Sequence, residues 1–371
     1  LDLGIGNSLR NSVGSLIDVA GEANLKWEFL AFFRLLTMVG IGAAAVLLAA
    51  SLWFQLLSDN RAVVFALYLP VLLLLPLLLG ASVLQGARAF GLQSLLKSAG
   101  SWLFFGYIFV LQWFEMGKVD LMDVAVVWSV FYVISLLIIF KLALSYLQLH
   151  PLQLLKNSSG GLPTARLKVG LSFLVLQVSS MVLYSMGNVI IYQGLGSAEV
   201  ARYDILNKIF LVGLSFFSIV ISIAWANISR LRALKDYPAL QVLYRKVMAL
   251  ALGFILCAFG IAAFASKVVQ VWTDGRIEVT EHEAFAIAAL VSIQAVAYVG
   301  AVFMNAFEII QLQVVLAGFS ILLMFPIAHI FLSMGYGIRA VPLASGMLTL
   351  LPMLVCNWKA LALIGTPRKL Q

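Results

Sequence analysis

Long apolar runs separated by short polar stretches dominate the pattern of hydrophobic and polar positions along this chain. A helix needs about 20 predominantly apolar residues to cross a bilayer. The runs are too long and too continuously apolar for a transmembrane barrel, whose strands show alternating segments of about ten residues. The pattern predicts the end of a membrane-spanning helix at residues 1–9, followed by ten complete ones at 29–56, 62–85, 95–116, 122–147, 168–194, 203–227, 246–271, 284–308, 311–334 and 339–364.

Composition places these helices in a membrane. Hydrophobic residues make up 63% of the chain and charged residues 11%, and the mean hydropathy is +1.05. A soluble domain carries about 25% charged residues and could not bury so much apolar surface. We therefore expect an all-α fold, a polytopic bundle of transmembrane helices.

Lys and Arg are distributed unequally between the two sets of loops. If the loop after residue 9 is cytoplasmic, that side holds 17 of the 24 basic residues and the other side holds 7. Positive charge is retained on the cytoplasmic side, so this assignment orients the chain. The net charge of +8 then reflects topology, and we predict no nucleic-acid partner.

A stretch with linker composition interrupts the series of helices. It contains two Pro, two Gly and two Ser, and reads LQLHPLQLLKNSSGGLPTAR. Such a composition is typical of loops and domain boundaries. We predict an N-terminal lobe at 1–150, a cytoplasmic linker at 151–167 and a C-terminal lobe at 168–371.

The two predicted lobes resemble each other weakly. Asn7 matches Asn227 at an offset of 220 residues, and Trp53 matches Trp272 at an offset of 219. Both copies place their basic loop on the same side of the membrane, which predicts a parallel repeat about an axis along the membrane normal. Transporters are commonly built from such repeats, with the substrate site between the halves.

The sequence offers little for catalysis or metal binding. Cys257 and Cys356 both fall inside predicted spans, where packing explains them better than a disulfide or a metal does. The three His residues are scattered, and no carboxylate pair lies in a polar loop of any size. We predict no catalytic residue and no metal ligand, and a membrane-embedded sugar polymerase or transferase stays a remote alternative.

Polar side chains recur at helical spacing in three predicted spans of the C-terminal lobe. Side chains three or four positions apart share one face of a helix, and a polar face cannot meet lipid without cost. Each stripe faces either a neighbouring helix or a hydrated cavity, and both interpretations stay open. The stripes comprise Gln177, Ser180, Tyr184, Asn188 and Tyr192; Asp204, Lys208, Ser215 and Ser222; and Gln294, Tyr298 and Asn305.

Lys208 is unusual because it lies inside a span, on the side of the membrane that has few basic residues. Asp204 precedes it by four positions, about one helical turn. One interpretation is a local ion pair whose Lys reaches the outer interface. The other is a cation that points into the cavity, with a protonation state tuned by Asp204.

Four stretches of the chain carry a resemblance: LDLGIGNSLRNSVGSLIDVAGEANLK (1–26), ASVLQGARAFGLQSLLKSAGS (81–101), YSMGNVIIYQGLGSAEVARYDILNKIF (184–210) and GYGIRAVPLASGM (335–347). They are similar to motifs of bacterial lipid-linked oligosaccharide flippases. These O-antigen and exopolysaccharide exporters form the polysaccharide branch of the multidrug/oligosaccharidyl-lipid/polysaccharide (MOP) superfamily. The resemblance implies two pseudo-repeated lobes of six helices, with the first helix and part of the second expected to precede Leu1.

The resemblance also implies a function. The protein would flip a polyprenyl-pyrophosphate-linked oligosaccharide from the cytoplasmic to the periplasmic leaflet of the bacterial inner membrane by alternating access, without making or breaking bonds. No cofactor is implied, and coupling to protons or sodium stays open. Its partners would be the lipid-linked oligosaccharide, membrane lipids, a polysaccharide polymerase and glycosyltransferases.

Such a head group needs amides, hydroxyls and aromatic faces for sugar, and cations for the diphosphate. For the cations Arg10, Arg34 and Arg88, ordinary retention of positive charge on the cytoplasmic side is the favoured explanation. The substrate-binding candidates are Asn7, Arg10, Gln177, Tyr184, Asn188, Tyr192, Asp204, Lys208, Gln294, Tyr298 and Asn305.

A cation-coupled multidrug antiporter of the same superfamily is the alternative, since it would share the fold. Its cavity would favour carboxylates that bind cations, whereas the spans of this chain offer mainly amides, tyrosines and a Lys. Many relatives also carry an acidic residue where this chain has Gly187. That difference argues against carboxylate-based ion coupling at this position.

Overall fold

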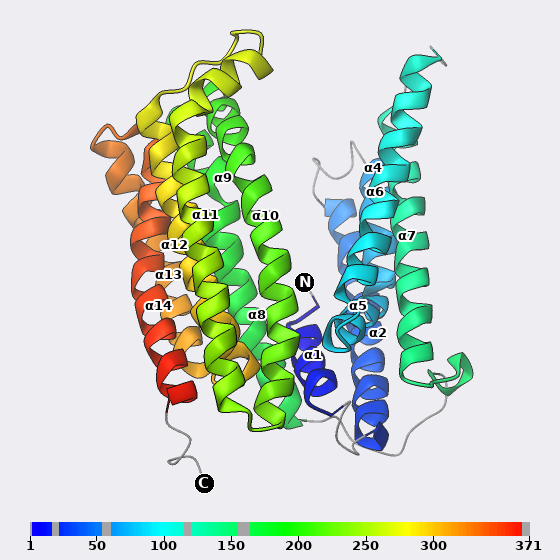
Figure 1. Cartoon of the computed structure of the whole chain (residues 1–371). Helices are drawn as coiled ribbons and strands as arrows, with labels where there is room; N and C mark the ends of the chain where they lie inside the picture. Colours follow the sequence, from blue (N-terminus) through cyan, green and yellow to red (C-terminus); the bar gives the residue numbers. More distant parts are fainter. Residues whose placement is uncertain (1, 17–21, 54–60, 115–119, 155–163, 366–371) are drawn as a thin grey trace. The chain divides into compact units, whose positions relative to one another are not determined.

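The computed structural model describes residues 2–16, 22–53, 61–114, 120–154 and 164–365 (Figure 1). Within these ranges the chain forms 13 α-helices and three short 3-10 helices, and no strand. Nine helices are long and apolar enough to cross a membrane, and one bent pair of helices makes a tenth candidate among the described residues. The prediction of an all-α polytopic bundle is confirmed, and the ten candidates follow the predicted spans in order.

The chain divides into two compact units, Leu1–Leu171 and Ser172–Gln371. The first contains the helices α1 (Ile5–Leu16), α2 (Glu22–Trp53), α4 (Arg61–Leu73), α5 (Leu78–Gly86), α6 (Phe90–Trp113) and α7 (Leu121–Tyr146). Helix α8 (Thr164–Ser185) begins in the first unit and continues into the second. Much of the predicted linker, residues 155–163, lies outside the described residues, and the predicted lobe boundaries stay predictions.

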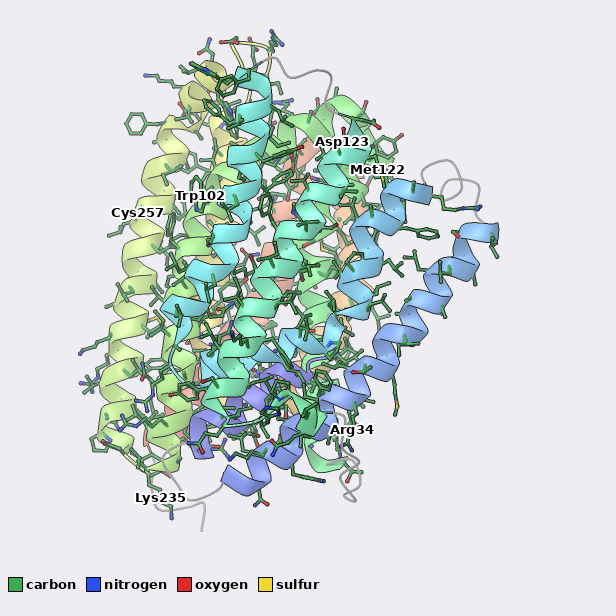
Figure 2. All side chains as sticks on the ribbon, turned by 90° about the vertical axis from the view of Figure 1, so that its right-hand side faces the viewer. Arg34, Trp102, Met122, Asp123, Lys235 and Cys257 are labelled. Atoms are coloured by element: carbon green, nitrogen blue, oxygen red, sulfur yellow. The ribbon has the colours of Figure 1, made fainter. Side chains whose placement is uncertain are left out.

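The core of the first unit lies between α1, α2, α5 and α7. Phe29 of α2 and Phe140 of α7 stack with ring centroids 6.1 Å apart, and Ile5, Leu9 and Val13 of α1 are fully buried. Helix α1 extends well beyond residue 9, where the sequence pattern placed the end of a helix. On the outside, α6 exposes large apolar side chains such as Trp102, at 73% exposure (Figure 2). Such a surface suits lipid rather than water.

The predicted span at 62–85 is bent by 52° between α4 and the segment from Leu75 to Gly86. The bend follows from Pro76, which lies in the short 3-10 helix Leu75–Leu77 and has no N–H to donate to the carbonyl of Leu72. That carbonyl lies against Gly40 of α2, at a position where a side chain would collide with it. Proline and glycine together therefore shape this span.

The second unit continues with α9 (Gly187–Leu195), α10 (Ser197–Ala233), α11 (Tyr237–Trp272), α12 (Glu281–Ala306), α13 (Gln311–Ser333) and α14 (Ala340–Gly365), with the 3-10 helix Gly337–Arg339 before α14. Helix α12 is its centre. Of the 18 residues in its most apolar stretch, 67% are buried, whereas the corresponding share is 22–28% for α10, α11, α13 and α14. It packs most extensively against α14 and α11. Only α12 among these five helices is therefore largely withdrawn from the surface.

Two differences from the predicted spans bear on the site. The span expected at 168–194 is two helices, α8 and α9, separated at Met186, which has a ψ of 0°. Helices α10 and α11 have 37 and 36 residues and extend well beyond the apolar runs that predicted them. At 1.5 Å per residue such helices are about 55 Å long, more than the ~30 Å of a hydrocarbon core.

The residues that suggested a repeat occupy corresponding places. Trp53 is the last residue of α2, and Trp272 is the last residue of α11. Asn7 and Asn227 both lie within helices, α1 and α10. These placements are compatible with a parallel repeat, which stays a prediction.

Candidate functional site

Hydrogen bonds of three hydroxyl groups join α8 to α14 inside the second unit. The Tyr184 hydroxyl lies 3.1 Å from Thr349 Oγ1. Because Thr349 donates its own hydrogen to the Ser345 carbonyl at 2.6 Å, Tyr184 is the donor of this pair. Ser345 in turn donates to the Leu183 carbonyl at 2.6 Å, so α8 and α14 are joined twice.

Two predicted candidates of α12 lie near the same hydroxyl. Gln294 and Tyr298 are the side chains of α12 that interact electrostatically with Tyr184. Gln294 is only 3% exposed, and its Oε1 has no hydrogen-bond partner within the described structure. A buried amide acceptor without a partner is costly and is an obvious place for a ligand group or a water molecule to bind. The structure therefore brings together Tyr184, Gln294 and Tyr298.

A second polar group joins α9 to α10. Asn188 Nδ2 donates to Asp204 Oδ1 at 3.1 Å, and Lys208 Nζ lies 2.6 Å from Asp204 Oδ2. The side chains of Lys208 and Asp204 are 58% and 32% exposed. The predicted Asp204–Lys208 ion pair is present, and it has an amide partner that helical spacing could not reveal.

Gly187 precedes Asn188 at the break between α8 and α9. A Cβ at this position would lie 2.9 Å from the Tyr203 hydroxyl of α10 and 3.0 Å from Val341 of α14. The space next to Gly187 is therefore already filled. An acidic side chain at position 187 would have to displace Tyr203. A carboxylate is supplied instead by Asp204, which bonds the next residue, Asn188.

The remaining candidates of the second unit are not part of these two groups. Tyr192 is 63% exposed on α9, and its hydroxyl has no described bond to either group. Asn305 accepts a bond of 3.0 Å from Gln313 Nε2, which connects α12 to α13. Gln177 is half-buried on α8. Ser215, which shared the stripe of Lys208, donates to the Leu211 carbonyl of its own helix.

Asn7 and Arg10 lie in the first unit, on α1. Asn7 is half-buried and Arg10 is only 4% exposed. On the same helix Ser12 donates to Glu28 Oε1 of α2 at 3.0 Å, so a buried carboxylate belongs to this unit.

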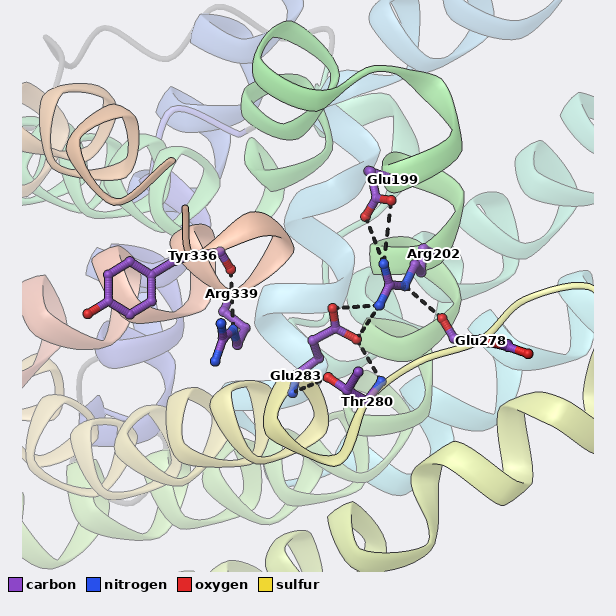
Figure 3. Close-up of polar contacts among 7 residues, drawn as sticks. All are labelled: Glu199, Arg202, Glu278, Thr280, Glu283, Tyr336 and Arg339. Atoms are coloured by element: carbon purple, nitrogen blue, oxygen red, sulfur yellow. Dashed lines mark hydrogen bonds and ion pairs between the residues drawn. The ribbon is translucent and has the colours of Figure 1, made fainter. Parts of the chain in front are cut away.

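An ion-pair network at one end of α10 and α12 was not predicted from the sequence (Figure 3). Arg202 bonds both carboxylate oxygens of Glu283, at 2.7 and 2.8 Å, and also Glu199 and the Glu278 carbonyl. Glu283 closes a capping box with Thr280 at the start of α12. The pair of Glu199 and Arg202 is visible in the sequence, but the bond to Glu283 spans 81 residues and needs the fold.

Thr349, Ser345 and Asn357 of α14 were also missed. Asn357 accepts a bond of 2.9 Å from the Tyr244 hydroxyl of α11 and donates to the Val296 carbonyl of α12 at 3.0 Å. Their helix was predicted as a plain apolar span, and no polar stripe singled them out. Within the described ranges, no group of three or more His, Cys, Asp or Glu side chains could hold a metal ion.

No known family model matches the chain, and no curated protein matches it. Solved structures do. A multidrug resistance MATE family transporter of the MOP superfamily, in an outward-facing conformation, has 15% sequence identity and a TM-score of 0.77, over 100% of this chain and 85% of that one. A point mutant of a MATE protein has 14% identity and a TM-score of 0.77, over 99% and 85%.

A third structure is a MOP superfamily transporter from Pyrococcus furiosus, with 15% identity and a TM-score of 0.69 over 99% of this chain and 85% of that one. That protein is described as having a binding pocket of reversed polarity, which suggests a different function for it. At these identities the likeness shows a shared fold. This chain has the fold of MOP superfamily transporters.

Proposed function

We propose that this chain is a membrane transporter that works by alternating access. The observation that carries the proposal is its fold, which matches MOP superfamily transporters over essentially its whole length. Polar groups inside the second unit are compatible with it, since amides and hydroxyls in a membrane bundle either line a hydrated pathway or bond neighbouring helices. The neighbours named above are described as transporters, which gives no support to a sugar polymerase or transferase.

The comparisons favour cation-coupled multidrug antiport as the first candidate for the substrate class. The neighbours described by function include a multidrug resistance transporter. An antiporter needs a carboxylate that binds one cation in exchange for another. Asp204 can be that carboxylate, because its partner Lys208 is 58% exposed and its one described ion pair is with Asp204. A cationic substrate or coupling ion would compete with the Lys208 ammonium for this carboxylate.

Flipping of a lipid-linked oligosaccharide is the second candidate, favoured by a different observation. Lys208 neutralises Asp204, so the pair offers no net negative charge to attract a cation. Amide and hydroxyl groups that suit sugars lie in the same unit, at Asn188, Tyr184 and Gln294. The diphosphate would then meet the Lys208 ammonium in the periplasmic half of the bundle, and the partners would be a polysaccharide polymerase and glycosyltransferases.

Substitutions in the ion pair separate the two candidates. Antiport predicts that Asp204→Asn abolishes efflux of a cationic dye such as ethidium, while Lys208→Met retains it. Oligosaccharide flipping predicts that Lys208→Met abolishes glycan display in a flippase-deficient strain, that Lys208→Arg keeps part of it, and that exchanging the two residues does not restore it. Ser215→Ala is the matched control, because this hydroxyl bonds only to its own helix among described contacts.

Protein levels in the membrane must be equal for all variants. If neither Asp204→Asn nor Lys208→Met changes either transport activity, the pair is structural and both assignments of the site are wrong. If the wild-type protein supports neither dye efflux nor glycan display, both proposed substrate classes are wrong.

A further inference from the structure

A pocket with both basic and apolar lining residues lies between α10 and α11, at the end of these helices that the charge count assigns to the cytoplasm. Its volume is about 400 Å³, and it lies within the second unit. The turn that joins the two helices carries Lys235 (Figure 2). The lining includes Asn227, Arg230 and Leu231 of α10, and Val242, Leu243 and Lys246 of α11.

The polar lining of the pocket is cationic. Asn227 and Arg230 are three positions apart and share one face of α10, and Lys246 lies across from them on α11. The Asn227 amide is oriented by a bond of 3.3 Å to the Ile223 carbonyl. Arg232 is directed elsewhere, since it donates to the Ala306 carbonyl and lies over the Phe307 ring. Two cations and an amide therefore surround this one cavity.

Helix polarity adds to this positive charge. Helix α11 begins at Tyr237, and Ala239 of its first turn also lines the pocket. The N-terminus of a helix carries a partial positive charge and favours anions. Asp236 caps the helix by accepting a bond from the Ala239 N–H at 3.1 Å, so one carboxylate is close by and already engaged. Lys246 and the helix end favour an anionic ligand, and Arg230 lies beside them in the lining.

Apolar side chains continue from the pocket toward the middle of the membrane. Ile223 lies one turn deeper than Asn227 on α10 and is 47% exposed, and Leu250 lies one turn deeper than Lys246 on α11 and is 51% exposed. Val242, in the lining itself, is 49% exposed. A ligand that fits both parts carries a phosphate at one end and a hydrocarbon chain at the other.

We propose that this pocket binds the head group of an anionic phospholipid of the cytoplasmic leaflet, with an acyl chain along α10 and α11. Lys246 would pair with the phosphate, as cations near a membrane surface do with anionic lipids. The bound lipid would hold together the ends of the two longest helices of the unit. The site is separate from the proposed transport site and does not rest on the proposed function.

The test is a titration of the purified full chain in a neutral detergent with short-chain phosphatidylglycerol, with bound lipid counted by native mass spectrometry. We expect saturable binding of phosphatidylglycerol and weaker binding of phosphatidylcholine of the same chain length. Lys246→Gln should weaken phosphatidylglycerol binding about fivefold, the effect of one cation at a membrane surface. Lys246→Arg should retain it.

Arg245→Gln is the matched control, because Arg245 is the adjacent residue of the same helix, is exposed and does not line the pocket. It should leave the affinity for phosphatidylglycerol unchanged. Equal losses for Lys246→Gln and Arg245→Gln, or equal binding of the two lipids, would overturn the proposal. Displacement of phosphatidylglycerol by millimolar inorganic phosphate would show a site for free anions instead and would overturn the lipid assignment. None of these measurements involves transport.

Discussion

Tyr184 and Tyr192 show how differently two residues of one sequence stripe can be used. Tyr184 donates to Thr349 Oγ1 inside the second unit, next to Gln294 and Tyr298. Tyr192 lies two turns further along the predicted face, but it belongs to α9 and is 63% exposed. The break at Met186 places Tyr184 and Tyr192 on different helices, one hydroxyl hydrogen-bonded to the buried Thr349, the other on an exposed side chain. Removing each hydroxyl therefore measures what the hydrogen bond of Tyr184 contributes to stability.

We expect Tyr184→Phe to lower the free energy of unfolding by about 1 kcal/mol, because it removes one hydrogen bond and leaves Thr349 Oγ1 with a buried acceptor unmet. Tyr192→Phe should change it by much less, since this side chain is 63% exposed and its hydroxyl has no described bond to lose. Denaturant unfolding of the detergent-purified variants is the measurement. Equal changes in the free energy of unfolding for the two variants would show that the bond from Tyr184 to Thr349 Oγ1 does not contribute to stability.

The Asp204–Lys208 pair adds little to stability at the residue scale. Both side chains are substantially exposed, and exposed ion pairs one turn apart on a helix contribute only about 0.3–0.5 kcal/mol. Variants of either residue should therefore fold. Their effects on transport can be interpreted as effects on the site.

At the scale of elements, the contact between α12 and α14 organises the second unit. Gly300 of α12 permits the close approach: a Cβ there would lie 2.6 Å from Asn357 N and 2.8 Å from the Cys356 carbonyl carbon. Asn357 then bonds α11 and α12 through Tyr244 and Val296. One small residue thus allows an amide of α14 to bridge two neighbouring helices.

Gly300→Ala should destabilise the protein, because the added methyl group meets backbone atoms and overpacking costs about 1–3 kcal/mol. Gly253→Ala is the matched control: nothing lies within 4 Å of the added methyl in α11. It should stabilise the protein by up to about 1 kcal/mol, since alanine is the better helix former. Melting temperatures in detergent should move in opposite directions, and a common direction would contradict the close packing of α12 on α14.

At the scale of the whole molecule, the charge asymmetry predicts orientation. Seventeen of the 24 basic residues lie on the side assigned to the cytoplasm. The turn between α10 and α11 with Lys235 belongs to that side, and the start of α12 at Glu281 belongs to the other. Because successive loops lie on opposite sides of the membrane, one position in each of these two loops is enough to test the orientation.

We expect a single Cys at position 281, in a background with Cys257 and Cys356 replaced by Ala, to react with a membrane-impermeant maleimide in intact cells. A single Cys at position 235 should react only after lysis. Both positions are exposed, so reactivity reports sidedness rather than burial. The reverse labelling pattern would invert the topology, and with it the leaflet assigned to the lipid pocket.

The apolar pattern predicted the number and order of the spans because the bilayer imposes a minimum length of apolar helix on every crossing. It did not place the break at Met186 or the 52° bend after Leu73, because a count of apolar residues does not register the backbone N–H that Pro76 lacks or the backbone angles at Met186. Helix ends outside the bilayer, such as those of α10 and α11, are polar and leave no such pattern.

The sequence by itself determined that this is an all-α membrane protein, and it located the Asp204–Lys208 pair, since one helical turn brings these side chains together. Only the tertiary structure decided that Asn188 joins this pair, that Tyr184 meets Thr349, and that Arg202 reaches Glu283. Helical periodicity states which residues share a face, but it does not state which helix that face meets. Contacts between residues far apart in the chain follow from packing, where volume and hydrogen bonding must be satisfied together.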